Sequence, residues 1–308
     1  MATRGIMVIL SQNINIILIT GPTASGKSGF ALQLADKYNG EIINADSMQV
    51  YDIIQILTSR PSIQDMRGIP HHLYGHIFPG DSYSTGEWLR CAKKMIFDIQ
   101  KRGHLPVVVG GTGLYFRALT GNFSEMPDVP DSIRKIVREW LHQYGTEALY
   151  SKLASIDFPA SQKIKSRDGQ RIARALEIFM SSGKSITQFW EQSKEQSMSS
   201  LSPLKLLILP ERDELNKNIK HRFKYMMDNG AVEEVQKLVN FELSSDLPAM
   251  KAIGVRDIIL MLKNEISYEQ TLERGVIATR QYAKRQITWF RNQLDKSWQR
   301  IPSLKEFI

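Results

Sequence analysis

The 308-residue sequence predicts an α/β fold, in which a parallel sheet is flanked by helices and interrupted by a helical insertion. Two observations support this prediction. In the first 124 residues, continuous apolar runs alternate with amphipathic segments, which is the pattern of βαβ units. The middle of the chain begins with a proline-rich stretch at residues 126–130 and then shows helical periodicity, before residues 204–209 have the composition of one more strand.

Each element follows from its local pattern. Residues 15–20, 41–44, 105–109 and 204–209 are short apolar runs, as expected for strands buried on both faces. Helical spacing of apolar residues predicts helices at 27–38, 87–102, 132–144, 146–153, 168–182 and 268–291. We therefore expect an α/β core whose first part is residues 12–124, a helical insertion at 125–202, and completion of the core with C-terminal helices at 203–308. Residues 197–203 are predicted to be a linker.

Composition excludes some classes of protein. Cys91 is the single cysteine, which rules out a disulfide framework and a cysteine-rich zinc module. The adjacent His71 and His72 do not predict a metal site, because neighbouring side chains of a strand do not converge on one ion. Two apolar runs near the N-terminus are broken by Ser11, Gln12 and Asn13. Each run is shorter than the length of about 20 residues that a membrane-spanning helix needs. We therefore expect a soluble, cytoplasmic protein with no membrane partner.

The charge is mildly basic and is concentrated locally. The chain has 40 Lys and Arg against 32 Asp and Glu, a net charge of +8. Basic side chains dominate residues 163–174 and 280–300. Such clusters suit solvated helix faces as well as a polyanionic partner, so charge alone does not decide the function.

A phosphate-binding loop follows the first predicted strand. Residues 21–28, GPTASGKS, match the pattern G-x4-G-K-[ST] between a strand and a helix, which predicts a P-loop NTPase-like core. Its glycines allow successive N–H groups to face phosphate oxygens, Lys27 adds positive charge, and Ser28 can hold Mg²⁺. The pattern leaves open whether the ligand is ATP, GTP or another diphosphate.

Two further motifs stand at strand ends. Asp46 follows the second strand, and residues 110–113, Gly-Gly-Thr-Gly, follow the third. Ligands of open parallel sheets bind at the carboxyl ends of the strands, so all three motifs should face one crevice. A metal-positioning carboxylate, a general base and a structural cap all remain possible roles for Asp46. The glycines predict either a tight turn or close approach to a ligand.

Six segments together resemble bacterial tRNA dimethylallyltransferases (tRNA isopentenyltransferases). They are GPTASGKS at 21–28, NADSMQVY at 44–51, PHHL at 70–73, PVVVGGTGLY at 106–115, DGQRIARALE at 168–177 and ATRQYAKRQITWFR at 278–291. The resemblance spans about residues 14–300 in the order and spacing of the family. It implies transfer of a dimethylallyl group from dimethylallyl diphosphate to N6 of the adenine 3′ to the anticodon, tRNA position 37.

The resemblance also implies roles for individual residues. Asp46, Lys27 and Thr112 would be catalytic, with Asp46 as the base that accepts the amine proton. The diphosphate site would comprise Gly21, Thr23, Ala24, Ser25, Gly26, Lys27 and Ser28, with Ser28 on or near Mg²⁺. The tRNA anticodon stem-loop would contact Asp46, Ser47, Met48, Gln49, Thr112, Arg134, Gln170, Arg171, Ile172, Ala173, Arg174, Arg280 and Lys284. We expect a monomer.

Some positions depart from the pattern of the family. Leu57 stands where a glycine is usual, Arg60 replaces a lysine, Lys165–Arg167 replaces His-Pro-Asn, and Val255 replaces an aromatic residue. These changes affect tRNA contacts more than chemistry.

The alternative functions are an isopentenyltransferase acting on free adenylates, an ATP-dependent kinase of small molecules, and a non-catalytic RNA-binding protein. The basic segments favour tRNA over a free nucleotide as the acceptor.

Overall fold

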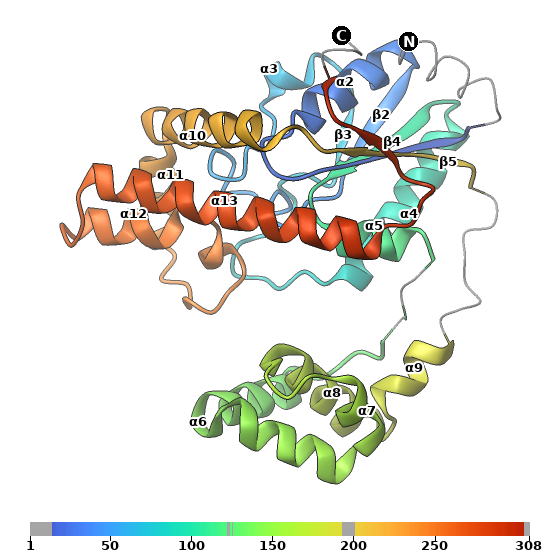
Figure 1. Cartoon of the computed structure of the whole chain (residues 1–308), viewed down its shortest axis with the longest axis vertical. Coiled ribbons are helices and arrows are strands. Elements are labelled where there is room, and N and C mark those ends of the chain that lie inside the picture. Colours follow the sequence, from blue (N-terminus) through green and yellow to red (C-terminus); the bar gives the residue numbers. More distant parts are fainter. Residues whose placement is uncertain (1–13, 122–123, 125, 193–200, 305–308) are drawn as a thin grey trace. The chain divides into compact units, whose positions relative to one another are not determined.

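The computed structural model describes residues 14–121, 124, 126–192 and 201–304 (Figure 1). Contacts between Cα atoms divide the chain into two compact units. The first comprises residues 1–117 and 199–308, and the second comprises residues 118–198. The apolar run at 6–10 and most of the predicted linker lie outside the described residues. Among the described residues, the structure contains no helix that is both long and apolar enough to cross a membrane.

The first unit is built on a six-stranded parallel sheet, which confirms the predicted α/β class. Its order is β3-β2-β4-β1-β5-β6. The strands are β1 (Ile16–Thr20), β2 (Gly40–Asn44), β3 (His71–His72), β4 (Leu105–Gly110), β5 (Pro203–Ile208) and β6 (Gln299–Ile301). The four predicted strands match β1, β2, β4 and β5 to within a residue at each end, because apolar runs buried on both faces have a distinct composition.

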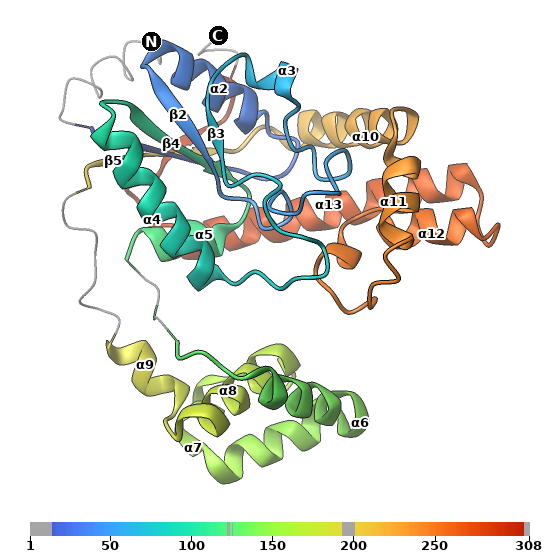
Figure 2. The same ribbon diagram turned by 180° about the vertical axis from the view of Figure 1, so that it is seen from behind.

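Helices cover both faces of this sheet (Figures 1 and 2). Phe30 and Leu34 of α2 pack on the face that carries Ile17, Ile19 and Val107. The helices of the first 121 residues are, in chain order, α2 (Lys27–Lys37), α3 (Ile63–Met66), α4 (Thr85–Lys101) and α5 (Gly113–Leu119). Helix α4 begins two residues before the predicted start, because Ser84 and Glu87 form a capping box that fixes its first turn.

The C-terminal helices form a second core beside the sheet. They are α10 (Arg212–Asp228), α11 (Ala231–Val239), α12 (Val255–Leu262) and α13 (Tyr268–Gln293), with a 3₁₀ turn at Ala249–Lys251. Phe223 of α10 and Val255 of α12 pack against Val50, Tyr51 and Ile54, from the segment that follows β2. Helix α13 and its neighbours thereby lie beside the carboxyl end of the sheet, where the predicted site is located. Val255 is buried, so the usual aromatic residue is replaced by a smaller core residue.

The second unit is helical and has its own core. It contains α6 (Asp131–Ile156), α7 (Phe158–Lys163), α8 (Gly169–Ser182) and α9 (Ile186–Gln192). Val137, Leu153, Ile172 and Leu176 are fully buried in it. Helix α6 is interrupted at Gly145, whose φ of 77° and ψ of 176° are non-helical, so its halves correspond to the two predicted helices.

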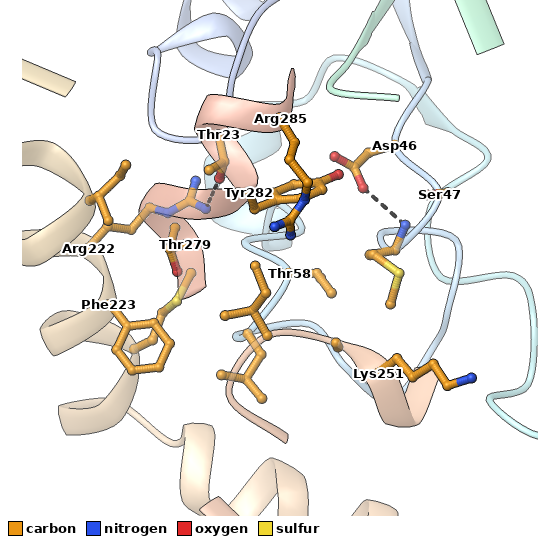
Figure 3. Close-up of a pocket in the computed structure, with 16 residues that line it drawn as sticks. Thr23, Asp46, Ser47, Thr58, Arg222, Phe223, Lys251, Thr279, Tyr282 and Arg285 are labelled. Atoms are coloured by element: carbon orange, nitrogen blue, oxygen red, sulfur yellow. Dashed lines mark hydrogen bonds between the residues drawn. The ribbon is translucent and has the colours of Figure 1, made fainter. Parts of the chain in front are cut away.

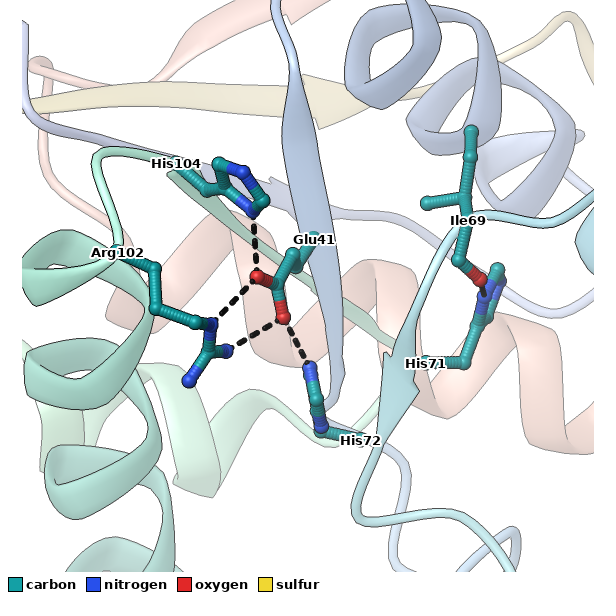
Figure 4. A network of polar contacts seen from close by, with 6 residues as sticks. All are labelled: Glu41, Ile69, His71, His72, Arg102 and His104. Atoms are coloured by element: carbon teal, nitrogen blue, oxygen red, sulfur yellow. Dashed lines mark hydrogen bonds and ion pairs between the residues drawn. The ribbon is translucent and has the colours of Figure 1, made fainter.

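A cluster of ionisable side chains around the buried Glu41 joins the strands at the end of the sheet opposite to the site (Figure 4). The Glu41 carboxylate of β2 accepts two hydrogen bonds from Arg102, at 3.1 and 2.7 Å. His72 of β3 and His104 also contact it, each at 2.6 Å. Burial alone would raise the pKa of Glu41, but these hydrogen bonds outweigh it and lower that pKa to about 2. His72 is therefore part of a structural network rather than a metal pair with His71.

Candidate active site

The carboxyl ends of β1, β2 and β4 bring the three predicted motifs together. The Ser47 backbone N–H donates to the Thr112 hydroxyl at 2.9 Å, and that hydroxyl donates to the Ser47 hydroxyl at 3.2 Å. A Cβ atom on Gly111 would lie 3.2 Å from Oδ2 of Asp46. The loops after β2 and β4 are therefore in direct contact beside the phosphate loop, as expected for a switch point of a parallel sheet.

The phosphate loop leads directly into α2. Gly26 has a φ of 84° at the N-cap, and no side chain caps the first N–H groups of the helix. These N–H groups and the helix dipole favour an anion at this end. The Lys27 ammonium donates to the carbonyl of Pro22 at 3.2 Å. Burial lowers the pKa of Lys27 to about 8, although Asp46 opposes this shift; Arg222 adds to it. Lys27 is therefore positioned to bind an anionic ligand.

Asp46 lines a cavity (Figure 3). Its Oδ1 accepts a hydrogen bond from the backbone N–H of Met48 at 3.0 Å. The neighbouring Asn44 accepts from the Asp46 N–H at 2.8 Å and donates to the carbonyls of Asp46 and Leu73, both at 3.0 Å. These contacts fix the backbone around the carboxylate, so it enters the cavity in a defined orientation.

The cavity has a volume of about 320 Å³ and is lined by both polar and apolar side chains. The ionic and polar groups include Thr23, Asp46, Arg222, Lys251 and Arg285 (Figure 3). The apolar surface comes from Leu57, Ile219, Phe223, Met226, Ala252 and Ile253. A second, more open hollow of about 380 Å³ is lined by residues 24–29 of the phosphate loop and by Arg222. Arg222 therefore lines both spaces, and the arrangement suits a ligand with a short hydrocarbon and an anionic group.

Two residues of this site were not predicted from the sequence. Arg222 of α10 donates a hydrogen bond to the Thr23 hydroxyl. Gln286 of α13 accepts from the Thr23 backbone N–H at 2.8 Å and donates to the Gly111 carbonyl at 3.0 Å. The sequence contains a weak signal for both, because each is a polar residue at an apolar position of its helix. Burial lowers the pKa of Arg222, and the Asp46 carboxylate opposes that shift.

The glycines after β4 allow close packing within the protein. A Cβ atom on Gly110 would lie 2.1 Å from the backbone of Ala45, and one on Gly113 would lie 2.2 Å from Trp289. Neither distance is possible for a real side chain, so these positions require glycine. The close approach is therefore to β2 and α13. The Trp289 ring fills the space beside Gly113.

Several predicted tRNA contacts take a different position in the structure. Ile172 is fully buried and Ala173 is 6% exposed, so their side chains belong to the core of the second unit. The side-chain amide of Gln49 donates to the carbonyls of Thr58 and Ser59, at 2.9 and 3.0 Å, so its nitrogen is used inside the protein. Ser47 and Met48 both line the cavity.

The basic side chains on the two units are accessible. Arg171 is exposed and lies 3.3 Å from Asp168, while the half-buried Arg174 lies 3.1 Å from Glu177. Arg134, which like Arg171 and Arg174 belongs to the second unit, lies 3.5 Å from Asp131. Gln170 on α8, and Arg280 and Lys284 on α13, are exposed. Each unit therefore presents cations on its surface.

Comparison with known proteins agrees with this geometry. The family model "IPP transferase" matches residues 49–293, and the model "Isopentenyl transferase" matches residues 14–74. The tRNA dimethylallyltransferase of Allorhizobium ampelinum is 51% identical over 95% of this chain and 96% of its own length. That of Agrobacterium fabrum is 51% identical over 95% of this chain and 98% of its own length.

Solved structures give the same result. The tRNA isopentenylpyrophosphate transferase of Bacillus halodurans has a TM-score of 0.66 and 32% identity, over 95% of this chain and 92% of its own. A eukaryotic dimethylallyltransferase acting on tRNA has a TM-score of 0.82 and 27% identity, over 96% of this chain and 76% of its own. With a family model covering most of its length and relatives of this similarity, the chain belongs to the IPP transferase family of tRNA dimethylallyltransferases.

Proposed function

We propose that this protein transfers a dimethylallyl group from dimethylallyl diphosphate to N6 of the adenine at tRNA position 37. The products are N6-isopentenyladenosine and diphosphate. The observation that carries this proposal is the shared cavity: the Asp46 carboxylate and the phosphate-loop residue Thr23 line one space together with apolar side chains. A prenyl diphosphate and an adenine amine require those three environments at one point.

The reaction is a substitution at carbon. N6 of adenine attacks the allylic carbon, the bond from that carbon to the diphosphate oxygen breaks, and the amine proton passes to Asp46. The exocyclic amine is a weak nucleophile, so alignment in a closed space contributes most of the acceleration. Proton removal adds a smaller factor, roughly 10²–10⁴. The Thr112 hydroxyl, which contacts Ser47, shapes the place where the base and the donor meet.

The leaving diphosphate would be held by the phosphate loop. Its N–H groups, the Lys27 ammonium and the Arg222 guanidinium supply preorganised positive charge where negative charge develops. The Ser28 hydroxyl lines the same hollow. Hydroxyl, carboxylate and phosphate oxygens are the ligands that Mg²⁺ prefers, so Ser28 and the donor's own oxygens would hold it. Bound there, Mg²⁺ would neutralise part of the diphosphate charge.

The protein would bind the tRNA mainly through its phosphate groups. Arg171 and Arg174 on the second unit, and Arg280 and Lys284 on α13, carry charge that suits an anticodon stem-loop. The adenine must leave its stack to reach Asp46, at a cost of a few kcal/mol that these contacts offset. We expect the protein to act as a monomer in the cytoplasm.

One assay distinguishes this reaction from transfer to free nucleotides and from kinase activity. The purified protein is incubated with Mg²⁺ and dimethylallyl diphosphate in three separate reactions. The acceptor is a tRNA that has A37 in the first, AMP in the second and ATP in the third. Mass spectrometry should find a five-carbon group on the tRNA alone. The matched control is the same tRNA with G37, which should stay unmodified. A product on AMP or ATP instead, or no prenylated tRNA at any salt concentration, contradicts the proposal.

A further inference from the structure

A buried carboxylate outside the cavity holds the segment that forms one of its walls. Glu234 of α11 is 6% exposed. Its Oε2 accepts a hydrogen bond from the backbone N–H of Ile56 at 2.7 Å, and its Oε1 accepts from the same group at 3.1 Å. Oε2 also accepts from the N–H of Leu57 at 3.3 Å. A buried carboxylate is costly unless it is hydrogen-bonded, and here its partners are successive amides of one loop.

That loop, residues 54–60, carries cavity residues. Leu57 and Thr58 line the same space as Asp46 and Arg222. The loop contains no helix or strand. Besides its own turn hydrogen bonds, which the N–H groups of Ser59 and Arg60 donate to the carbonyls of Ile56 and Gln55, it is held by side chains from elsewhere. Gln49 binds the carbonyls of Thr58 and Ser59, as described above, while Glu234 binds the N–H groups on the preceding two residues. The loop is therefore held from both directions, by an amide donor and a carboxylate acceptor.

Glu234 reaches no substrate itself. It is absent from the walls of the cavity, and its neighbours Val235 and Leu238 anchor α11 in the C-terminal core. We propose that Glu234 is a positioning residue, whose carboxylate fixes Ile56 and Leu57 so that Leu57 and Thr58 form the wall against which the prenyl donor is aligned. This inference rests on the proposed function, because it assigns the wall to the donor.

Electrostatics add a consequence that a purely structural contact would lack. Burial raises the pKa of Glu234 to about 7, while the N–H groups of Ile56 and Leu57 and the charge of Arg60 oppose the shift. Arg60 is the charged group that acts on it from the loop, and the exposed Glu233 precedes it on its own helix. Two good acceptor oxygens exist only in the ionised form, so the loop should be held more firmly above pH 7 than below it.

The test compares Glu234→Ala and Glu234→Gln with Glu233→Gln, a control at the exposed neighbouring position. Hydrogen exchange of the peptide that contains residues 54–60 reports on the loop without any substrate. Steady-state kinetics with dimethylallyl diphosphate and A37 tRNA report on donor alignment. Glu234→Gln keeps the size of the side chain and one acceptor, so it remains informative if the alanine variant does not fold.

We expect faster exchange in the loop peptide of both Glu234 variants and unchanged exchange in the control. In Glu234→Ala, kcat/KM for the donor should fall about 10- to 100-fold, the cost of a misplacement of about 1 Å, with the KM for tRNA within about twofold. In wild type, the protection factor of the loop amides, which is the intrinsic exchange rate at each pH divided by the measured rate, should rise as the pH passes through about 7, and this dependence should be absent in Glu234→Gln.

The outcomes separate the inference from the proposed function. If wild type modifies tRNA while both Glu234 variants match the control in exchange and in kcat/KM, Glu234 does not position the wall. If exchange is faster but donor kinetics are unchanged, the loop contact exists without a role in alignment, and the inference is again wrong. If wild type modifies no tRNA, the proposed function fails, whatever the exchange measurements find.

Discussion

Gln286, near the C-terminal end of α13, accepts a hydrogen bond from the backbone N–H of Thr23 in the phosphate loop at 2.8 Å. Its amide nitrogen donates to the carbonyl of Gly111, in the loop after β4, at 3.0 Å. One buried side chain thus joins two of the three loops that surround the candidate active site. A glutamine suits this role because its amide offers an acceptor and a donor at the same distance from the helix.

Replacing Gln286 should therefore loosen both loops. Gln286→Ala leaves a buried N–H and a carbonyl without partners, which should lower the free energy of unfolding by about 1–3 kcal/mol and reduce turnover. Gln286→Glu keeps an acceptor for Thr23 but turns a carboxylate oxygen toward the Gly111 carbonyl in a buried position, so it should also lose stability and turnover. Urea unfolding and the tRNA assay measure these effects, with the exposed Gln281→Ala on the same helix as the control. Equal behaviour of Gln286→Ala and the control would contradict the bridging role.

Asp46→Asn tests the base directly. The asparagine can still accept the N–H of Met48 through its oxygen, so the loop should keep its path. It cannot accept the amine proton, so kcat should fall roughly 10²- to 10⁴-fold while tRNA affinity changes little. Single-turnover kinetics and tRNA binding by filter retention measure the two quantities, with the exposed Asp36→Asn as the control. Unchanged kcat would remove Asp46 from proton transfer.

The sequence predicted the fold and the centre of the site, for physical reasons that particular residues make clear. Continuous apolar runs identified the four long strands, but β3 and β6 have only two and three residues and no apolar run. Asp46 and the phosphate loop were predicted because each directly follows a strand. Gln286 and Arg222 stand 263 and 199 positions from Thr23, so only tertiary packing brings them to it. Helical periodicity describes the face on which a residue lies and does not name its partner.

The Glu41 cluster should contribute to stability and not to activity. Its pKa of about 2 is below the value of 4.5 for an unperturbed glutamate, so its contribution is present above about pH 4.5 and is lost as the pH falls toward 2. Glu41→Gln should lower the free energy of unfolding at pH 7 by roughly 1–3 kcal/mol, since it leaves Arg102 and the histidines with one neutral acceptor oxygen in place of a carboxylate.

Chemical unfolding at a series of pH values tests this prediction. The difference between wild type and Glu41→Gln should shrink between pH 5 and pH 2. Glu41 lies at the start of β2 and Asp46 beyond its end, so kcat/KM at pH 7 should remain within about twofold of wild type where the variant is fully folded. The exposed Glu273→Gln is the control. A difference that is constant over this pH range would show that the cluster does not hold an ionised Glu41.

Binding of the prenyl donor should weaken at alkaline pH because Lys27 loses its proton there. Burial lowers its pKa to about 8 in the free protein, from an ordinary value of 10.5. The ammonium therefore loses its proton over the range in which an exposed lysine remains charged, and a neutral amine no longer attracts diphosphate. Because kcat/KM reports on the free enzyme, kcat/KM for dimethylallyl diphosphate should fall about tenfold per pH unit above about pH 8. Lys27→Met should have a low kcat/KM without that decline, while Lys37→Met, at the exposed end of the same helix, should behave as wild type. A decline that persists unchanged in Lys27→Met would assign the titration to another group.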